Sequence, residues 1–237
     1  MTLPEITIFI DCADFASIRK ALELPWTGGF TTNPSLVSQA GVADYTAYAR
    51  QVLALVPIMP VSFEVLSNTA DGMEQEARII HSWGKNVYVK IPVIDPAGNS
   101  MGGLIKQLSA ERIPLNVTCV FTPEQAKIAA HSLDAATPAY VSVFAGRIAD
   151  VGIDPLPIVE ECRDILKGLP KTELIWASTR EVYNIWQAAG AGCDAITAPL
   201  AMVAKLRNAG KDLTELSRDA VNAFIQDIAQ AGVKFSA

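Results

Sequence analysis

The chain has 237 residues, half of them hydrophobic, and a formal net charge of −6. That length suits one α/β barrel of ordinary size, so we expect residues 1–237 to form a single domain. The acidic residues are scattered and no basic block occurs, which argues against nucleic-acid binding through phosphate neutralisation and favours small-molecule partners.

The sequence gives no indication of a membrane protein. Its most apolar run, residues 53–61, is short and is interrupted by Pro57 and Pro60, so we expect no membrane-spanning helix. The amino terminus lacks the basic and apolar pattern of a signal peptide, and we expect a cytoplasmic protein. Four cysteines lie far apart without a C-x-x-C pair, which predicts reduced thiols in or near the core: Cys12, Cys119, Cys162 and Cys193.

Short apolar runs alternate with amphipathic segments along the whole chain. We predict strands at Ile6–Asp11, Gly29–Asn33, Pro60–Leu66, Val87–Val93, Pro114–Val120, Tyr140–Gly146, Glu173–Ser178 and Ala195–Pro199. We predict helices between them at Asp14–Leu24, Asp44–Val56, Asp71–Trp83, Pro123–Ser132, Pro155–Lys167, Arg180–Ala189 and Leu200–Asn208. The strand starts recur every roughly 22 to 33 residues, which is the spacing of repeated βα units.

Eight strands that alternate with helices favour a closed (β/α)8 TIM barrel over an open doubly wound sheet. The remaining segment, Leu213–Ala231, has apolar residues at helical spacing and predicts an additional C-terminal helix, a candidate to pack on a neighbouring subunit. A mean hydropathy of +0.26 is high for a soluble monomer and also favours burial between subunits.

In such a barrel the active site lies at the carboxyl ends of the strands. Polar residues occur at almost every one of these ends: Asp11, Thr32, Asn33, Glu64, Lys90, Asn116, Thr118, Ser142 and Ser178. Residues two apart share a face of a strand, which pairs Tyr88 with Lys90 and Trp176 with Ser178. The same rule pairs Ser62 with Glu64, Asn116 with Thr118 and Ser142 with Phe144. The alternate residues of the fourth strand are apolar, so we expect Lys90 to point into the barrel.

A lysine between apolar walls suggests covalent chemistry. Desolvation penalises the ammonium, and a deprotonated amine can attack a carbonyl to form a Schiff base, an electron sink for cleavage of a carbon–carbon bond. Neighbouring carboxylates can transfer the protons that this reaction needs. The competing interpretation is a structural ion pair of Lys90 with Glu64 or Asp11, which leaves the polar residues of the other strands unexplained.

An anion site is predicted beyond the sixth and seventh strands, where Arg147, Ser178 and Arg180 occur. We expect Arg180 to open a helix, a position that disfavours a cation unless an anion is bound there. The alternative is an arginine on a solvated helix surface, and the presence of Arg147 at the preceding strand end favours the anion site.

Five motifs in this order resemble the transaldolase family, in its shorter branch that includes the fructose 6-phosphate aldolases. They are TTNPS at residues 31–35, VKIP at 89–92, NVT at 116–118, SVFAGR at 142–147 and ASTR at 177–180. The resemblance covers nearly the whole chain. It implies carbohydrate metabolism of the pentose phosphate type, sugar phosphate substrates, no metal or organic cofactor, and a homo-oligomer built from rings, such as a pentamer-based decamer.

The resemblance also implies a role for each matching residue. Lys90 would form the Schiff base, Asp11 would take the proton of the donor's C4 hydroxyl, and the pair Glu64 and Thr118 would hold the catalytic water. The remaining positions would bind the substrate. Asn33, Asn116 and Ser142, with Thr32 and Phe144 beside them, would hold the dihydroxyacetone part, and Arg147, Ser178 and Arg180 would hold the phosphate.

Within the family the residues favour the transferase over the aldolase that releases dihydroxyacetone. The aldolases typically carry Gln in place of Glu64 and Tyr in place of Phe144. The hydroxyl of that tyrosine could help to end the intermediate. Three positions depart from the usual pattern: Cys12, Val143 and Thr179. Because Thr179 lies between two expected anion ligands, a sugar with another anionic group, such as a sulfonate, stays open as a substrate.

Two functions outside this class also fit a barrel. A metal-dependent aldolase or isomerase would need a cluster of histidines or carboxylates, and the chain has two histidines, His81 and His131, in segments predicted as outer helices. A noncatalytic sugar-phosphate sensor would keep the pocket without turnover. Covalent trapping of a substrate on Lys90 separates both from a Schiff-base enzyme.

Overall fold

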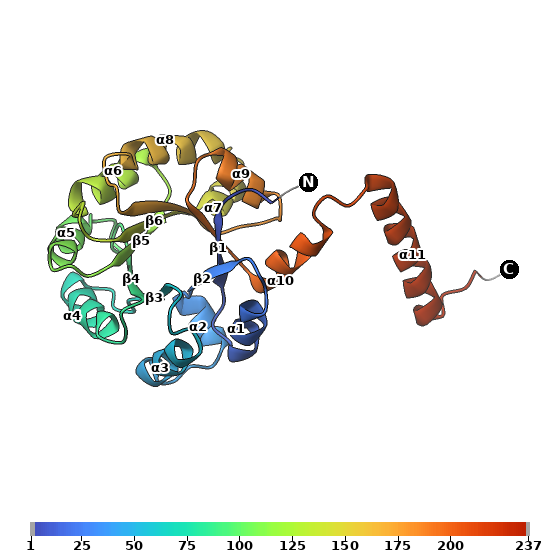
Figure 1. Cartoon of the computed structure of the whole chain (residues 1–237), viewed down its shortest axis with the longest axis horizontal. Coiled ribbons are helices and arrows are strands. Elements are labelled where there is room, and N and C mark those ends of the chain that lie inside the picture. Colours follow the sequence, from blue (N-terminus) through green and yellow to red (C-terminus); the bar gives the residue numbers. More distant parts are fainter. Residues whose placement is uncertain (1–2, 236–237) are drawn as a thin grey trace.

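The computed structural model describes residues 3–235, in which eight parallel strands close into one barrel in the order of the sequence (Figure 1). The strands are β1 (Thr7–Asp11), β2 (Thr27–Thr31), β3 (Val61–Glu64), β4 (Val87–Pro92), β5 (Leu115–Val120), β6 (Ala139–Val143), β7 (Thr172–Trp176) and β8 (Ala195–Ala198). The first and last strands pair in parallel, which completes the ring. The predicted (β/α)8 barrel is confirmed.

Helices surround this ring and connect successive strands, except for the last three helical elements of the chain, which follow β8. They are α1 (Phe15–Leu22), α2 (Pro34–Gln39), α3 (Tyr45–Leu55), α4 (Ala70–His81), α5 (Gly102–Ala110), α6 (Pro123–Ser132), α7 (Ala145–Asp150), α8 (Leu156–Leu166), α9 (Asn184–Gly190), α10 (Leu200–Val203) and α11 (Leu213–Ala231), with a 3-10 helix, η1, at Ala204–Asn208. Polar caps set several of the starts. The side chains of Asp14, Asp44, Thr69 and Thr122 each accept a hydrogen bond from the backbone N–H three residues on.

The helix predictions differ from the structure at five places. The short helices α2, α5 and α7 were not expected, and the segment predicted at Leu200–Asn208 is divided between α10 and η1. The prediction that Arg180 opens a helix is wrong, because α9 begins only at Asn184. The side chain of Asn184 accepts hydrogen bonds from the backbone N–H groups of Arg180 (2.8 Å) and Glu181 (3.1 Å), which holds these residues in a turn.

Two apolar layers stabilise the barrel. The larger layer lies between the strands and the outer helices, and it includes Ile91 of β4 and Trp176 of β7. The smaller layer fills the inside of the barrel around Phe9, Tyr140 and Ile175. The rings of Phe9 and Tyr140 meet edge to face at 5.3 Å. Because this inner layer closes the barrel below the carboxyl ends of the strands, the polar residues at those ends lie above a packed floor.

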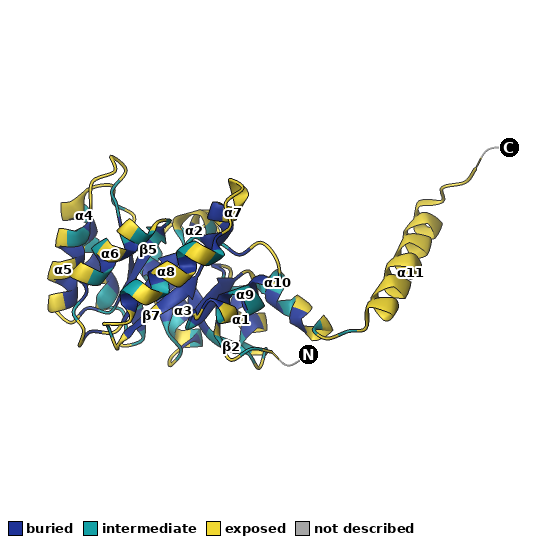
Figure 2. Cartoon of the chain, turned by 90° about the horizontal axis from the view of Figure 1, so that it is seen from above, coloured by how far each residue is buried: buried dark blue, intermediate teal, exposed yellow. Residues whose placement is uncertain are grey.

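The helix α11 stands apart from the barrel, to which it is joined through α10 and η1 (Figure 1). It is exposed along its whole length, and none of its residues is buried (Figure 2). The additional C-terminal helix is therefore confirmed, and its apolar residues have no partner within the part of the chain that the structure describes.

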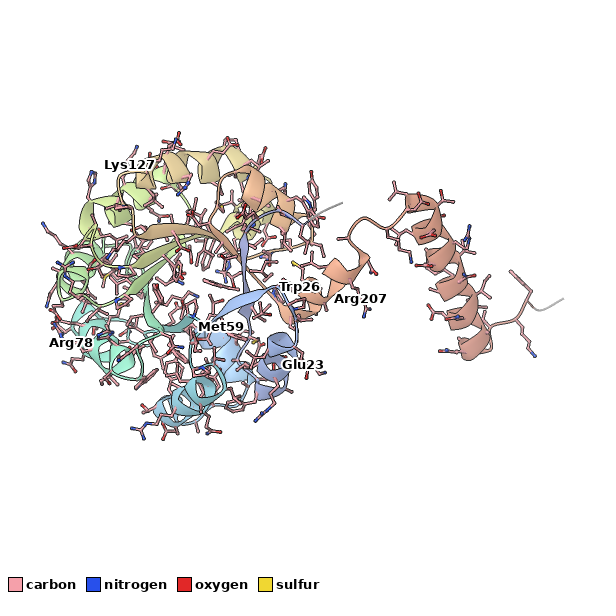
Figure 3. All side chains as sticks on the ribbon, viewed as in Figure 1. Glu23, Trp26, Met59, Arg78, Lys127 and Arg207 are labelled. Atoms are coloured by element: carbon pink, nitrogen blue, oxygen red, sulfur yellow. The ribbon has the colours of Figure 1, made fainter. Side chains whose placement is uncertain are left out.

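The outer surface carries charges that are paired with one another. Arg78 on α4 projects from the outer helices, away from the centre of the barrel (Figure 3), and forms ion pairs with Glu74 and Glu111. His81 ends α4 and His131 lies in α6, as predicted. Among residues 3–235 no helix has both the length and the apolar composition needed to cross a bilayer.

Candidate active site

A cavity of about 400 Å³ opens at the carboxyl ends of the strands, where the polar residues were predicted to converge. It is lined by Asp11, Thr31, Asn33, Pro34, Ser35, Leu36, Glu64, Lys90, Cys119, Ser142, Phe144, Arg147, Ser178, Thr179, Arg180, Thr197 and Pro199. Most of the residues singled out in the sequence are in this set. Thr32, Asn116 and Thr118 are not among the lining residues, and all three are buried.

Lys90 points into the barrel, as the alternation of β4 predicts. The register of the parallel strands places it directly between Glu64 on β3 and Asn116 on β5. Its Nζ lies 3.1 Å from Glu64 Oε2 and donates a hydrogen bond of 3.1 Å to the carbonyl oxygen of Thr32, and 8% of the side chain is exposed. The ion pair of the competing interpretation is thus present with Glu64.

These contacts leave one side of the nitrogen free. A tetrahedral Nζ has three positions besides its bond to carbon, and two of them face Thr32 and Glu64. Nζ forms no further hydrogen bond within residues 3–235, and Lys90 lines the cavity. If a proton passes from the ammonium to Glu64 or to water, the resulting lone pair can take up this third position, where a carbonyl carbon would approach.

Asp11 lies at the end of β1 in a set of hydrogen bonds of its own. Thr31 Oγ1 donates to Asp11 Oδ1 at 2.8 Å, and Asn33 Nδ2 donates to Asp11 Oδ2 at 3.4 Å. The hydroxyl of Thr197 on β8 lies 2.6 Å from that of Thr31 on β2, so the hydrogen bonds link β1 with both of its neighbouring strands. Burial raises the pKa of Asp11, while the charge of Lys90 and the two hydrogen bonds oppose this change.

Asn33 is held in place by the start of a helix. It is the N-cap of α2, where its Oδ1 accepts a hydrogen bond of 3.0 Å from the backbone N–H of Leu36. Pro34 follows at the first helical position, which suits the fixed backbone angle of proline. The TTNPS motif therefore aims Asn33 Nδ2 at Asp11 while it caps the helix.

Asn116 and Ser142 form a polar row inside the barrel. Asn116 Nδ2 donates to Ser62 Oγ at 3.0 Å, and Ser142 Oγ donates to Asn116 Oδ1 at 2.8 Å. Ser142 reaches the cavity, and Asn116 supports it from below. The hydroxyl of Thr118 is buried and has no hydrogen-bond partner among the described residues. An unpaired buried hydroxyl is costly, so water or a ligand is the expected partner.

The anion end of the cavity is built on two adjacent loops. Arg147 on α7 places its guanidinium carbon 5.3 Å from the centre of the Phe144 ring. Ser178 has a left-handed backbone with φ of 63°, and its carbonyl packs against Gly146. Arg180 lines the cavity but is also bound by Asp150 on the end of α7. The two arginines are therefore brought to one end of the cavity, without the helix start that was expected for Arg180.

The predicted shared face of Trp176 and Ser178 is wrong. Trp176 is buried in the layer under the outer helices, whereas Ser178 lines the cavity. The reason is that the chain leaves the regular strand at Trp176, and the positive φ of Ser178 breaks the alternation of faces.

Comparisons with known proteins show which family the chain resembles. The family model described as transaldolase/fructose-6-phosphate aldolase matches residues 8–237. A probable transaldolase of Thermoplasma volcanium is 39% identical over 199 residues, which cover 83% of this chain and 85% of that protein. A probable transaldolase of Syntrophobacter fumaroxidans is 37% identical over 224 residues, with 92% of this chain and 95% of that protein covered.

The chain belongs to the transaldolase/fructose-6-phosphate aldolase family.

Several residues at this transaldolase-family site were not singled out in the sequence. Thr197 lies near the carboxyl end of β8 and follows the rule that located the other polar residues, so it could have been found. Cys119 lines the cavity because its backbone is left-handed, with φ of 57°, at an irregularity in the pairing of β5 with β6. Burial raises its pKa. The sequence does not predict a left-handed backbone at a cysteine, since that conformation is typical of glycine or asparagine.

All four cysteines are free, and Cys12, Cys162 and Cys193 are buried, as predicted. Between residues 3 and 235 no group of three or more histidine, cysteine, aspartate and glutamate side chains could hold a metal ion.

The raised pKa of Asp11 leads to a prediction about stability and pH. The folded protein binds the Asp11 proton more tightly than the unfolded chain, whose value is about 3.9, so ionisation of Asp11 lowers stability as the pH rises above that value. Asparagine does not ionise. We expect the difference in the free energy of unfolding, Asp11→Asn minus parent, to be larger (variant relatively more stable) at pH 7 than at pH 4, measured by urea denaturation.

Asp14 provides a control of opposite sign. Its hydrogen bonds with Ser17 lower its pKa, so its ionised form stabilises the fold above the unfolded value. The difference in the free energy of unfolding, Asp14→Asn minus parent, should therefore decrease from pH 4 to pH 7. If both variants changed in the same direction, the proposed effect of burial at Asp11 would be incorrect.

Proposed function

We propose that the protein is a transaldolase that transfers a dihydroxyacetone unit from a ketose phosphate, of the sedoheptulose 7-phosphate or fructose 6-phosphate type, to an aldose phosphate through a Schiff base on Lys90. The observation that carries this proposal is the position of Lys90 Nζ. It lies inside the barrel, beside Glu64, with one side free toward the cavity.

The reaction begins with imine formation. Lys90 Nζ attacks the C2 carbonyl carbon of the ketose, and loss of water from the carbinolamine gives the protonated imine. These steps need a group that donates and accepts protons close to Nζ. Glu64 is in contact with Nζ, and the unpaired hydroxyl of Thr118 could hold the water that is released and later used again.

Cleavage and transfer then use Asp11. Asp11 takes the proton of the C4 hydroxyl, the C3–C4 bond breaks, and its electron pair passes to the imine, which leaves an enamine and an aldehyde. The enamine next attacks the carbonyl carbon of the aldose phosphate, and Asp11 returns the proton to the new hydroxyl. Finally, water hydrolyses the imine and frees Lys90. A pKa raised by burial suits a carboxyl group that exchanges protons near neutral pH.

The remaining polar residues would orient the substrate. Asn33 and Ser142 line the cavity on either side of Lys90 and could bind the hydroxyls of the dihydroxyacetone unit, with Thr32 and Asn116 supporting them from below. Arg147, Ser178 and Arg180 would bind the phosphate. The supporting fact is that both arginines line the same end of the cavity.

Two related substrates or outcomes stay as alternatives. Phe144 carries no hydroxyl that could protonate the enamine, which favours transfer over release of dihydroxyacetone by a fructose 6-phosphate aldolase. Thr179 lines the anion end between Ser178 and Arg180, where its hydroxyl donates to the carbonyl of Thr197. A sulfonate in place of the phosphate would meet the same arginines.

Trapping the intermediate tests the proposal. The protein is incubated with fructose 6-phosphate and borohydride, and the expected result is a covalent mass increase on the peptide that contains Lys90. Addition of erythrose 4-phosphate before the reductant should then yield sedoheptulose 7-phosphate without free dihydroxyacetone. A metal-dependent enzyme would be inhibited by a chelator and give no adduct, and a sensor would give neither adduct nor product.

We also propose that the chain is one barrel domain, residues 1–237, whose helix α11 packs on a neighbouring subunit in a ring-based homo-oligomer such as a pentamer-based decamer. One face of α11 carries Leu213, Leu216, Val221, Phe224, Ile225 and Ile228, all exposed. So many exposed apolar side chains at helical spacing are typical of an interface. The free cysteines and a sugar phosphate substrate support a cytoplasmic location.

A charge on α11 should disrupt this assembly. We expect Phe224→Asp to reduce the molar mass of the particle, measured by light scattering after gel filtration, because a buried unpaired carboxylate opposes association. Asn222 is a control, since it is polar and exposed on the same helix, and Asn222→Asp should leave the mass unchanged. An unmodified chain that elutes as a monomer would contradict the oligomer.

A further inference from the structure

Arg180 is already bound by a carboxylate within the chain. Its Nε donates to Asp150 Oδ1 at 2.8 Å, and its Nη2 donates to Asp150 Oδ2 at 2.6 Å. Asp150 is the last residue of α7, thirty positions before Arg180 in the sequence. The carboxylate and the guanidinium thus form a bidentate pair, the geometry in which arginine also binds phosphate.

Little of the Arg180 guanidinium is left for another ligand. Arginine has five N–H groups, and two of them point to Asp150. Nη1 donates to the carbonyl oxygens of Ser178 and Thr179, both at 3.2 Å. The edge formed by Nε and Nη2 is therefore occupied by Asp150. An anion that binds this edge with two hydrogen bonds must displace Asp150, whereas one that accepts a single bond from the remaining N–H of Nη2 need not.

Asp150 also changes the net charge at this end of the cavity. The pKa of its carboxyl is held below the usual value, first by the hydrogen bonds from Arg180 and also by the charges of Arg180 and Arg147. Arg147, Arg180 and Asp150 together carry a net charge of about +1 when all are ionised. About half of the Arg180 and Asp150 side chains is exposed, so water screens the pair and an incoming anion can compete with it.

We propose that Asp150 is a specificity-determining residue: it occupies the Nε and Nη2 edge of Arg180 and reduces the charge of the anion site from two positive charges to one. A doubly charged tail loses more binding energy through this neighbouring carboxylate than a singly charged tail does. The preference of the site for a phosphate dianion over a monoanion, such as a sulfonate, is therefore smaller with Asp150 than it would be without its charge. This inference rests on the proposed function for the location of the substrate's tail.

The test uses Asp150→Asn, which keeps the shape of the side chain and removes its charge, with two small probes of the tail. Methyl phosphate at pH 8 is a dianion, and methanesulfonate is a monoanion. Removing a fixed negative charge changes the Coulomb energy of the bound probe in proportion to the charge of the probe. An increase in affinity of about threefold for methanesulfonate therefore implies an increase of about tenfold for methyl phosphate. Dissociation constants are measured by calorimetry or NMR titration, without turnover.

Two further variants complete the experiment. Asp150→Ser removes the same charge and replaces Asp150→Asn as the test if the asparagine variant folds poorly. Its affinity for methyl phosphate should also increase more than its affinity for methanesulfonate. Asp164 is a matched control, because it is an exposed aspartate on α8 that pairs with Lys167, and Asp164→Asn should leave both constants unchanged. Unchanged or weaker binding of methyl phosphate in the Asp150 variants would overturn the proposal, since Asp150 would then only support Arg180.

The failure of this inference and the failure of the proposed function can be told apart. If borohydride traps no adduct on Lys90 but the Asp150 variants bind methyl phosphate more tightly, the Schiff-base chemistry fails and the charge effect stands. If the adduct forms but the constants do not change, the transaldolase proposal stands and the role of Asp150 is wrong.

Discussion

Replacement of Lys90 by methionine is expected to abolish turnover and to destabilise the fold at the same time. Methionine keeps much of the volume but has no nucleophilic amine, and the loss of a covalent nucleophile costs a factor on the order of 10⁴ or more. Glu64, with 13% of its side chain exposed, would lose its counter-ion. Breaking a buried ion pair from one side destabilises a protein by about 3 kcal/mol or more. Sugar phosphate assays and urea denaturation measure the two effects separately.

A double variant separates chemistry from stability. Lys90→Met combined with Glu64→Gln removes both charges, so the free energy of unfolding should recover in large part while turnover stays absent. If the ion pair were purely structural, activity would follow stability and would recover in the double variant. Substantial turnover by the stable double variant would exclude Lys90 as the covalent nucleophile.

Gly146→Ala is expected to have the second largest effect, on the anion end of the cavity. An added Cβ would lie 1.6 Å from the carbonyl oxygen of Ser178 and 3.2 Å from Cγ of Arg180. The first of these contacts is with backbone, so the loop after β7 must move. Overpacking of this kind costs about 1–3 kcal/mol, and more where the backbone cannot relax. We expect lower stability and a KM for fructose 6-phosphate raised more than that for unphosphorylated fructose.

Gly103 is the matched control for this substitution. It lies in the first turn of α5, and a Cβ added there would meet no atom within 4 Å. Alanine is the better helix former, so Gly103→Ala should leave both KM values unchanged and stabilise the fold by up to about 1 kcal/mol. Equal behaviour of the two alanine variants would show that the close approach of Ser178 to Gly146 is unimportant for the site.

The strand pattern predicted the position of Lys90 correctly because β4 is regular over its whole length. Its alternating side chains and its register with β3 and β5 bring Lys90 between Glu64 and Asn116. The same reasoning failed at Ser178, where the chain has left the strand and φ is positive. Periodicity predicts side-chain direction only where the backbone repeats.

The start of α9 shows a second limit. Residues 180–183 have a composition compatible with a helix, but the side chain of Asn184 captures the N–H groups of Arg180 and Glu181. Local hydrogen bonds of this kind compete with helix formation. Sequence propensity alone does not decide the competition, since it depends on whether Asn184 is buried against the barrel.

The alternation of strands and helices, the barrel, the inward lysine and the acids at the strand ends were all determined by the sequence itself, because burial of one face of each element imposes a short repeat on the chain. The connection of Thr197 to Asp11 through Thr31, the capture of Arg180 by Asp150 and the exposure of α11 were decided only by the tertiary structure. The contacts of Asp11 and Arg180 join residues that lie far apart in the chain and carry no shared pattern. They exist because closure of the barrel brings the ends of distant strands to one rim.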